Sequence, residues 1–279
     1  MKASGGAVVE VEPRQASVEE LARVHSLEYI NEILVQNQCS EWSGPRPDLA
    51  ELASYFVGGT LTALDTLLSG KTRTAIHFPG AKHHAQHYYA SGFCIFADFA
   101  IAADIATKDH GKRVAILDFD GHHGDGTENL TSDNPDVLTY SVHEKGIFPG
   151  TGNESYPEKN VYNLPLVEKS KTSDLGKGDV ALMKAASEFV QHVSDFKPDL
   201  IFIASGADGH LEDPLTSLEY SVEGIKEIGK FIRRTHPDLP ILIGGAGGYL
   251  PDTRTPEVWS TFAHAVATTL AIGEDIDGS

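Results

Sequence analysis

The sequence predicts an α/β fold in which helices cover both faces of a mostly parallel β-sheet. Short apolar runs rich in β-branched residues, typical of buried parallel strands, alternate with longer segments of helical periodicity. The chain has 279 residues, of which 41% are hydrophobic, enough for one sizeable core. No internal repeat or low-complexity linker divides it, so we expect a single domain over residues 1–279, with little structural signal in residues 1–14.

Six helices are predicted from apolar residues at helical spacing and from capping signals at their ends. The first begins with a capping box formed by Ser17 and Glu20. The second ends at Gly70, and we expect Gly58-Gly59 to interrupt it. The last carries Pro256 at its first helical position. The predicted helices cover residues 17–34, 48–70, 93–107, 179–193, 222–233 and 256–272.

The predicted strands cover residues 72–78, 113–120, 137–142, 200–204 and 241–243, and a short edge strand is expected near Ala7-Val8-Val9. Parallel strands end at one edge of a sheet, and open α/β sheets bind their ligands at that edge. Unusual polar or glycine-rich segments follow four of these strands, beginning at Pro79, Asp118, Ser205 and Gly244. We therefore expect these segments to meet although they are far apart in the sequence.

Composition narrows the classes of partner. The net charge is −18, which argues against direct nucleic-acid binding, because that needs a basic face. No apolar run approaches the roughly 18 residues of a membrane helix, and the amino terminus resembles no signal peptide, so we expect no membrane partner. The two cysteines, Cys39 and Cys94, form no disulfide framework and no thiolate zinc motif. We expect a cytoplasmic protein with both thiols reduced.

The most informative stretch is the octet Asp118 to Asp125, which follows the predicted strand residues Val114 to Leu117. Side chains alternate along a strand, so Asp118, Asp120 and His122 point the same way as the chain leaves the sheet. Carboxylate and imidazole ligands suit zinc or another first-row divalent ion. An isolated Asp-x-Asp-x-His would fit an acidic turn with exposed histidines equally well. Asp208, after another strand, would complete a two-Asp, one-His set with coordination open for water and substrate.

Taken together, the motifs resemble the zinc-dependent histone deacetylase family, which includes bacterial deacetylase-like and acetoin-utilisation proteins. The resemblance runs in family order from about residue 17 to the carboxyl terminus, and the motifs are specific jointly rather than singly. It implies the three-layer arginase/deacetylase-like fold. The matching segments are Pro79-Gly80-x-x-His83-His84-Ala85, Ala90-Ser91-Gly92-Phe93-Cys94, Asp118-x-Asp120-x-His122-His123-Gly124-Asp125-Gly126, Phe148-Pro149-Gly150-Thr151-Gly152, Gly206-Ala207-Asp208 and Gly244-Gly245-x-Gly247-Gly248-Tyr249.

The resemblance implies one zinc ion per chain, held by Asp120, His122 and Asp208, with Fe²⁺ or another divalent ion as alternatives. It also implies a monovalent cation site, for example for K⁺. That second site would use Asp118, Asp120 and His122 together with Ser141 and Val142, largely through backbone carbonyls. Ser141 would equally fit as an ordinary serine at the end of a strand.

The same resemblance assigns catalytic roles to five residues. His84 would act as general base and acid, and His83 would be its electrostatic companion. Asp118 and Asp125 would hold His83 and His84, respectively, by hydrogen bonds that fix the tautomer and raise basicity. Tyr249 would donate a hydrogen bond to the scissile carbonyl. Taken singly, each histidine would more often be a loop residue, and the tyrosine a packed aromatic.

Four residues are predicted to line the substrate tunnel. By resemblance, Phe93 and Phe148 would enclose the acyl-lysine stem, with the backbone of Gly92 beside it. Leu215 matches an apolar rim position at which the polyamine-specific branch of the family has an acidic residue, so a polyamine substrate is disfavoured. Phe93 could instead be plain core and Phe148 a turn-packing ring. His123, Cys94 and His143 match family positions too, but we assign them no catalytic role.

The match fails at the amino terminus. Family members begin with a strand and an arginine-containing loop before the helix that here starts at Ser17, and residues 1–14 are too short to supply them. We therefore expect the first strand of the sheet, one tunnel wall and a basic residue of the internal exit pocket to be missing. A truncated reading frame, a fragment and a genuinely short variant all fit. The acidic rim residue that orients the substrate backbone has only Asp48 as a candidate.

These inferences predict a metal-dependent hydrolase that removes an acetyl or related acyl group from an amine. The expected substrate is an acetylated lysine side chain or a small acylated amine. Two other hypotheses stay open. One is a deacetylase-like protein that binds acyl-lysine without turnover because its amino-terminal wall is missing. The other is an arginase-like dinuclear hydrolase, which would need more carboxylate ligands than these loops offer. The oligomeric state cannot be inferred from the sequence.

Overall fold

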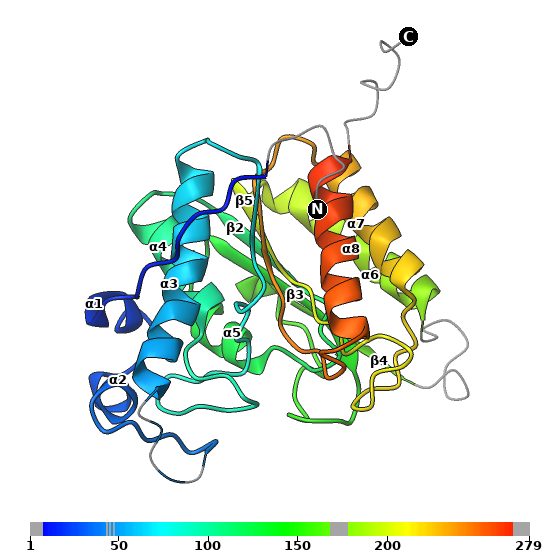
Figure 1. The fold of residues 1–279 in the computed structure, drawn as a ribbon. Helices are drawn as coiled ribbons and strands as arrows, with labels where there is room; N and C mark the ends of the chain where they lie inside the picture. The colour runs from blue at the N-terminus through cyan, green and yellow to red at the C-terminus, as the bar shows by residue number, and fades with distance from the viewer. Residues whose placement is uncertain (1–7, 43, 45, 47, 168–177, 270–279) are drawn as a thin grey trace.

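The computed structural model of the chain describes residues 8–42, 44, 46, 48–167 and 178–269 (Figure 1). Within these ranges, six strands form one all-parallel sheet in the order β1-β6-β5-β2-β3-β4. This confirms the predicted α/β class with a parallel sheet. The strands are β1 Thr74–His77, β2 Val114–Asp118, β3 Val137–Glu144, β4 Val161–Leu166, β5 Leu200–Ala204 and β6 Ile241–Gly244.

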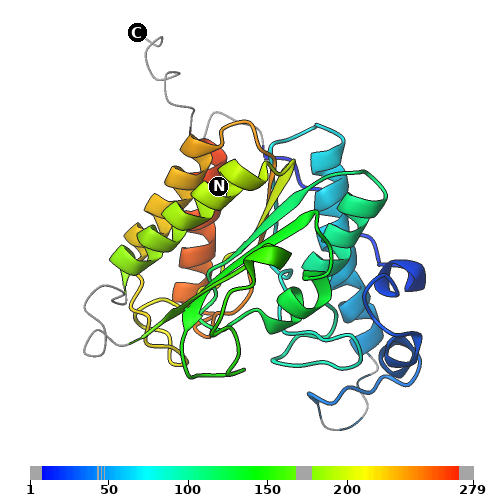
Figure 2. The same cartoon turned by 180° about the vertical axis from the view of Figure 1, so that it is seen from behind.

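Helices cover both faces of this sheet, which gives three layers (Figures 1 and 2). Helices α3, α4 and α5 lie on one face, and α6, α7 and α8 on the other, while α1 and α2 lie outside α3. The helices are α1 Val18–Leu21, α2 Leu27–Leu34, α3 Leu49–Leu68, α4 Asp98–Lys108, α5 Asp125–Thr131, α6 Asp179–Phe196, α7 Val222–Thr235 and α8 Arg254–Thr268. None of the helices in the described ranges is long and apolar enough to cross a membrane.

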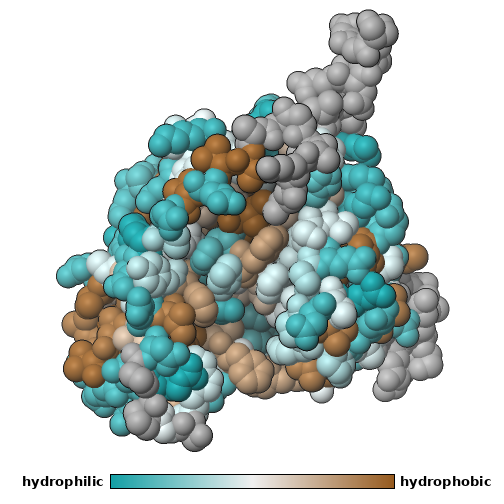
Figure 3. Space-filling model, in the orientation of Figure 1, coloured by the Kyte–Doolittle hydropathy of each residue, from teal (hydrophilic) through white to brown (hydrophobic). Residues whose placement is uncertain are grey.

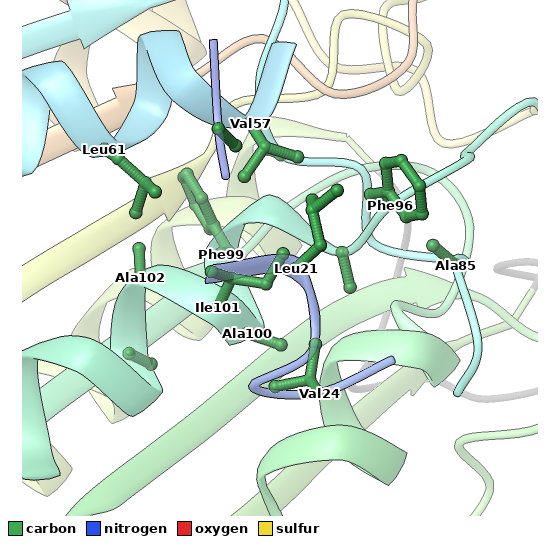
Figure 4. Packing of buried hydrophobic residues seen from close by; sticks show 14 of the residues in the cluster. Leu21, Val24, Val57, Leu61, Ala85, Phe96, Phe99, Ala100, Ile101 and Ala102 are labelled. Atoms are coloured by element: carbon green, nitrogen blue, oxygen red, sulfur yellow. The ribbon is translucent and has the colours of Figure 1, made fainter. Parts of the chain in front are cut away.

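The strands bury alternate side chains on opposite faces, so the sheet separates two hydrophobic clusters. In β2, Val114 and Ile116 belong to the cluster under α3 and α4, whereas Ala115 and Leu117 belong to the cluster under α6, α7 and α8. Figure 4 shows side chains of the first cluster from α1, α3 and α4, among them Leu21, Val57, Leu61, Phe99 and Ile101. Full burial on both faces explains why these strands read as continuous apolar runs.

The carboxyl ends of all six strands meet along the lower edge of the molecule in Figure 1. At the centre of that edge, Asp118 at the end of β2 lies in register with Ser141 of β3 and Ala204 of β5. The loops that follow β2 and β5 therefore start side by side. Register in the sheet thus brings residues 118–125 and 205–208 together, as the sequence predicted.

The helix predicted over residues 17–34 is wrong, because two short helices, α1 and α2, replace it. Ser17 and Glu20 do form the predicted capping box. The break follows from a second cap at Ser26, whose side chain accepts from the Tyr29 N–H, and from the buried His25 beside it. His25 uses both ring nitrogens, since Nδ1–H donates to Gln86 O and Nε2 accepts from Ala97 N.

The interruption expected at Gly58-Gly59 is also wrong, because α3 runs through both glycines without a break. These glycines serve close packing instead. A Cβ on Gly58 would lie 1.8 Å from the carbonyl oxygen of Arg14, and one on Gly59 would lie 2.2 Å from His77 Nε2. Glycine therefore lets the preceding chain segment and the end of β1 approach the axis of α3.

Other differences concern boundaries. The helix predicted from residue 93 begins at Asp98 as α4, since Phe93 has a positive φ of 63° within a turn closed by Ser91 and Cys94. Helix α5, strand β4 and the 3₁₀ turn Pro157–Lys159 were not predicted. Val8 and Val9 are exposed and in no strand, and Ala7 lies outside the described residues, as does the end expected for the last helix at residue 272. In the described residues before β1, no strand joins the sheet.

The face shown in Figure 3 is mostly hydrophilic, with hydrophobic side chains gathered at lower left over α1 and α2 and at the top beside the amino-terminal segment. Exposed apolar residues over α1 and α2 are Val18, Leu27 and Val35. Single exposed apolar side chains of this kind are common in folded proteins. They carry no functional argument by themselves.

Candidate metal centre and active site

Two carboxylates and one imidazole converge between the loops after β2 and β5. One ligand atom each from Asp120, His122 and Asp208 lies within 4.8 Å of the others, and all three residues are buried. His122 Nδ1 is 3.2 Å from Asp120 Oδ1 and 2.7 Å from Asp208 Oδ2. The structure thus brings together the three predicted metal ligands, although Asp208 is 86 residues from His122 in the sequence.

Backbone N–H groups hold both carboxylates in place. Gly247 N donates to Asp120 Oδ2 at 2.6 Å, and Gly121 N donates to Asp208 Oδ1 at 2.7 Å. Each carboxylate therefore has its other oxygen directed toward His122. A Cβ on Gly247 would lie 2.7 Å from Asp120 Oδ2 and 2.9 Å from Asp208 Oδ2, so this approach requires glycine. The glycine-rich segment after β6 thus serves as a cradle for the carboxylates.

The electrostatics of this group call for a cation. Burial, together with the charge on Asp120, raises the pKa of Asp208 to about 7. Burial opposes a charge on His122, yet hydrogen bonds and the charges of the two carboxylates raise its pKa to about 10. Two buried carboxylates in contact are costly without a compensating positive charge. A two-Asp, one-His set with Nδ1 directed at both carboxylates fits a first-row divalent ion.

Two further histidines lie beside this centre, each tied to a carboxylate of its own. His83 Nδ1–H donates to Asp118 Oδ2 at 2.7 Å, and His84 Nδ1–H donates to Asp125 Oδ1 at 2.7 Å. The two rings are 4.0 Å apart, and His83 Nε2 is 3.7 Å from Asp120 Oδ1. These pairings match those predicted from the sequence. In both histidines Nδ1 is occupied and Nε2 is left for chemistry.

The two rings differ in their affinity for protons. For His83, burial favours the neutral form, but the charges of Asp118 and Asp120 raise the pKa to about 9. For His84, burial and the positive charge of His83 lower the pKa below its ordinary value. The pair is therefore suited to one cationic and one neutral imidazole at neutral pH. Groups whose environments separate their pKa values in this way are typical of acid–base sites.

Aromatic side chains surround the entrance. Phe148 is half exposed, and its ring meets the His84 ring edge-on at 5.0 Å. Phe93 is 64% exposed, so it is not a core residue, and its ring lies 6.5 Å from that of Tyr249. The ring of Tyr249 is also 6.5 Å from His122. Gly92 has a φ of +53°, and a Cβ there would lie 2.4 Å from His84 Cδ2. The predicted tunnel residues and the predicted hydrogen-bond donor therefore border the centre.

The amino-acid sequence of the chain also matches known proteins. The profile of the histone deacetylase domain matches residues 2–266. The chain belongs to the histone deacetylase family. It is 35% identical over 276 residues to the acetoin utilization protein AcuC of Staphylococcus aureus (strain MRSA252), covering 90% of this chain and 69% of that protein. It is 36% identical over 274 residues to AcuC of Bacillus subtilis (strain 168), with the same coverage. Membership of the histone deacetylase family supports deacetylase activity and acetylated substrates.

Other residues of this deacetylase support the site but were not predicted. Buried Asp98 accepts from the N–H groups of Ala81 and Lys82 and so holds the loop that carries His83. Gln86 donates to Asp125 Oδ2. Neither belongs to a motif with a recognisable chemical spacing. Asp98 had one local signal, because an acidic residue in the first turn of a helix is favoured there by the helix dipole.

The rim of the deacetylase site is only partly as expected. Leu215 is 47% exposed beside Asp213, whose Oδ2 accepts from the Tyr249 N–H. The candidate acidic rim residue, Asp48, is paired with its neighbour Arg46. A different acidic side chain, Glu41, reaches the entrance, where its Oε2 accepts from the Phe93 N–H at 3.2 Å. No spacing rule in the sequence relates residue 41 to residue 93.

The predicted monovalent-cation residues lie in β2, in the loop that follows it and in β3. Asp118 pairs in register with Ser141, and Val142 follows it in β3. The Ser141 hydroxyl donates to His143 Nδ1 at 2.9 Å. A cavity of about 10 Å³ adjoins Asp118, Ser141 and Thr139. A cation at this position remains a prediction.

Proposed function

We propose that this chain is a zinc-dependent deacetylase that hydrolyses the amide bond of an acetylated amine, with acetyl-lysine as the substrate. One observation carries the proposal. The buried trio Asp120, His122 and Asp208 lies beside His83 and His84, each of which is bonded to its own carboxylate. A protein that only binds acyl-lysine would not need this combination of a metal-ligand set and two oriented imidazoles.

The roles of the residues follow from their surroundings. A divalent ion held by the trio would polarise the substrate carbonyl and make a water more acidic. His84 has Nδ1–H committed to Asp125, so its Nε2 can take the proton of the attacking water and then pass it to the leaving amine. Burial disfavours a charge on His83, but its bond to Asp118 favours the protonated ring, so His83 would provide a positive charge next to the developing oxyanion.

Tyr249 is proposed to donate its hydroxyl hydrogen to the substrate carbonyl oxygen. Burial, and the charges of Asp120 and Asp208, raise its pKa above the ordinary value, so the hydroxyl keeps its proton. Phe93 and Phe148 would enclose the aliphatic stem of the lysine between apolar rings. Leu215 at the rim favours a substrate without a second positive charge.

The compartment and the second ion belong to the same proposal. Cys39 and Cys94 are buried free thiols, which suits a reducing cytoplasm. A K⁺ ion beside Asp118 and Ser141 would support the loop that holds the metal ligands. We treat residues 1–279 as one catalytic domain, because the sheet draws its strands from Thr74 through Gly244.

A fluorogenic acetyl-lysine peptide assay tests the proposal. We expect turnover that a chelator abolishes and that added zinc restores. Tyr249→Phe should lower kcat by about 10²–10³-fold, the cost typical of a lost oxyanion donor. Tyr162→Phe on β4 is the matched control and should retain wild-type kcat. Absence of metal-dependent turnover on a panel of acylated amines would contradict the proposal.

A further inference from the structure

Two buried imidazoles outside the catalytic pair lie under the loop that carries Phe148. His123 directly follows the ligand His122, and His143 lies in β3. They are 2% and 1% exposed, and their ring centroids are 4.7 Å apart. The proposed chemistry assigns neither of them a role. Two buried imidazoles in contact need a reason, because each has two ring nitrogens to satisfy.

Both rings bind the segment Thr151-Gly152, one through a side chain and the other through the backbone. His123 Nδ1 is 2.8 Å from Thr151 Oγ1, and His143 Nε2–H donates to the carbonyl oxygen of Gly152 at 3.1 Å. Gly152 has a φ of +71°, and a Cβ there would lie 2.5 Å from His123 Cδ2 and 2.6 Å from His143 Cε1. The chain is thus pressed onto both rings where only glycine fits.

The far side of each ring is fixed as well. His123 Nε2–H donates to Glu128 Oε2 at 3.0 Å, and Asn163 Nδ2 donates to the same oxygen at 2.8 Å. Burial disfavours the charge of Glu128, but these two bonds lower its pKa below the ordinary value. His143 Nδ1 accepts from Ser141, and burial lowers the pKa of His143 to about 3. The two imidazoles therefore form a rigid base beneath the loop.

Phe148 depends on this base because its own stretch has few other ties. Lys145 N donates to Leu166 O before it. Across the described part of the chain, no hydrogen bond is formed by the backbone N–H groups of residues 146–148. The next anchor along the chain is Thr151-Gly152. The Phe148 ring in turn meets His84 at 5.0 Å.

We propose that His123 and His143 are positioning residues that act through Thr151 and Gly152 to hold Phe148 at the entrance, and thereby set the affinity for the acyl-amine stem. The inference rests on the proposed deacetylase function for its kinetic consequence. It makes one wall of the entrance preformed, so that substrate binding does not have to order it.

The test combines kinetics with backbone ¹⁵N relaxation on the zinc-loaded protein. Thr151 is exposed, so Thr151→Val removes the hydroxyl without disturbing the core. It should raise KM for an acetyl-lysine peptide by roughly threefold to tenfold, with kcat within twofold, the effect of one hydrogen bond. Thr151→Ser keeps the hydroxyl and should restore the wild-type KM. Backbone ¹⁵N order parameters of residues 147, 148 and 150–152 should fall in Thr151→Val and stay at the wild-type values in Thr151→Ser.

A double-mutant cycle with Phe148→Ala shows whether the effect passes through the ring. Phe148→Ala should raise KM by itself, and adding Thr151→Val should then change nothing further. An unchanged KM in Thr151→Val, or an equal increase in both backgrounds, would overturn the inference. If wild-type protein shows no turnover, the proposed function fails, and the order parameters alone decide: lower values for residues 147–152 in Thr151→Val support the clamp, and unchanged values reject it.

Discussion

Individual side chains of this site use one polar atom for a hydrogen bond that fixes their position and direct another toward the metal ligands or the substrate. Asp208 gives Oδ1 to the Gly121 N–H and directs Oδ2 to His122. His84 gives Nδ1 to Asp125 and leaves Nε2 for the substrate. A substitution that preserves the shape of a side chain can therefore remove the charge or the reacting atom while it keeps the hydrogen bond that positions the side chain. Isosteric changes are consequently the most informative probes at this scale.

Asp208→Asn should keep the bond to Gly121 but remove one of the two charges that face the cation. Loss of an outer hydrogen-bond partner of a metal ligand typically costs about 10–100-fold in metal affinity or activity, so loss of a ligand should cost at least that. Zinc content and affinity of the purified variant measure the effect. Full occupancy at wild-type affinity would end the three-ligand hypothesis.

Asp213→Asn is the matched control, because Asp213 is a buried carboxylate that binds the backbone of Leu215 and Tyr249 and belongs to no ligand set. Its zinc affinity should stay at the wild-type value. If instead Asp208 were only a structural residue, both variants would lose about 1–3 kcal/mol of stability and neither would lose metal.

At the scale of elements, the turns between helices help to position the site, as the helices do. The turn between α1 and α2 presents His25, which binds Gln86 O on one side and Ala97 N on the other. Those two residues bracket the segment that contains Gly92 and Phe93. A turn far from the sheet thus fixes one border of the entrance.

His25 should make stability depend on pH. Burial lowers its pKa to about 4, from an ordinary value of 6.5, so the folded state disfavours the proton that the unfolded state binds. The contribution of neutral His25 to stability is complete above pH 6.5 and is lost as the pH decreases from 6.5 toward 4, by about 3 kcal/mol. Urea denaturation between pH 7 and 4.5 measures this loss. His25→Gln should reduce the loss by about 3 kcal/mol, while the part due to other buried histidines such as His143 remains, and an unchanged slope would contradict the assignment.

Gly59→Ala offers a second test in which helix propensity and packing oppose each other. Alanine favours a helix by about 1 kcal/mol over glycine. The new Cβ would lie 2.2 Å from His77 Nε2, so we expect net destabilisation of about 1–3 kcal/mol. In a His77→Ala background the same change should become neutral or stabilising. Chemical denaturation of the four proteins decides, and a stabilised Gly59→Ala single variant would refute the packing argument.

For the whole molecule, the buried carboxylates at the carboxyl edge of the sheet are the main feature of the site that opposes folding. Asp120 and Asp208 are 1% and 0% exposed, so a cation between them should stabilise the folded state. Zinc at about a thousand times its dissociation constant adds about 4 kcal/mol. For a chain of this size we expect Tm to rise by roughly 10 °C over the chelated protein. Asp208→Asn should show a much smaller rise.

Features of the fold and site could be predicted from the sequence where they depend on residues that are close together in the chain. The octet Asp118 to Asp125 and the strand before it could be recognised because strand alternation and ligand spacing are local. The break at Ala22 and Ser26 could not, because it depends on His25 reaching residues 61 and 72 positions away. The role of Gly58-Gly59 could not be predicted for the same reason. Gly59 makes room for His77, which is distant in the sequence, and does not break the helix.

Separation of the two edges of the sheet has a consequence for engineering. The proposed site residues lie in the carboxyl-terminal part of a strand or after it, whereas the turns that lead into β2, β3, β5 and β6 lie at the opposite edge. One such turn contains Gly111, which has open space around it. A reporter domain inserted between His110 and Gly111 would stand away from the entrance. The chain could then serve as a fusion module whose substrate edge stays accessible. Loops at that edge could be replaced so that the site accepts other acyl groups, without redesign of the layers beneath.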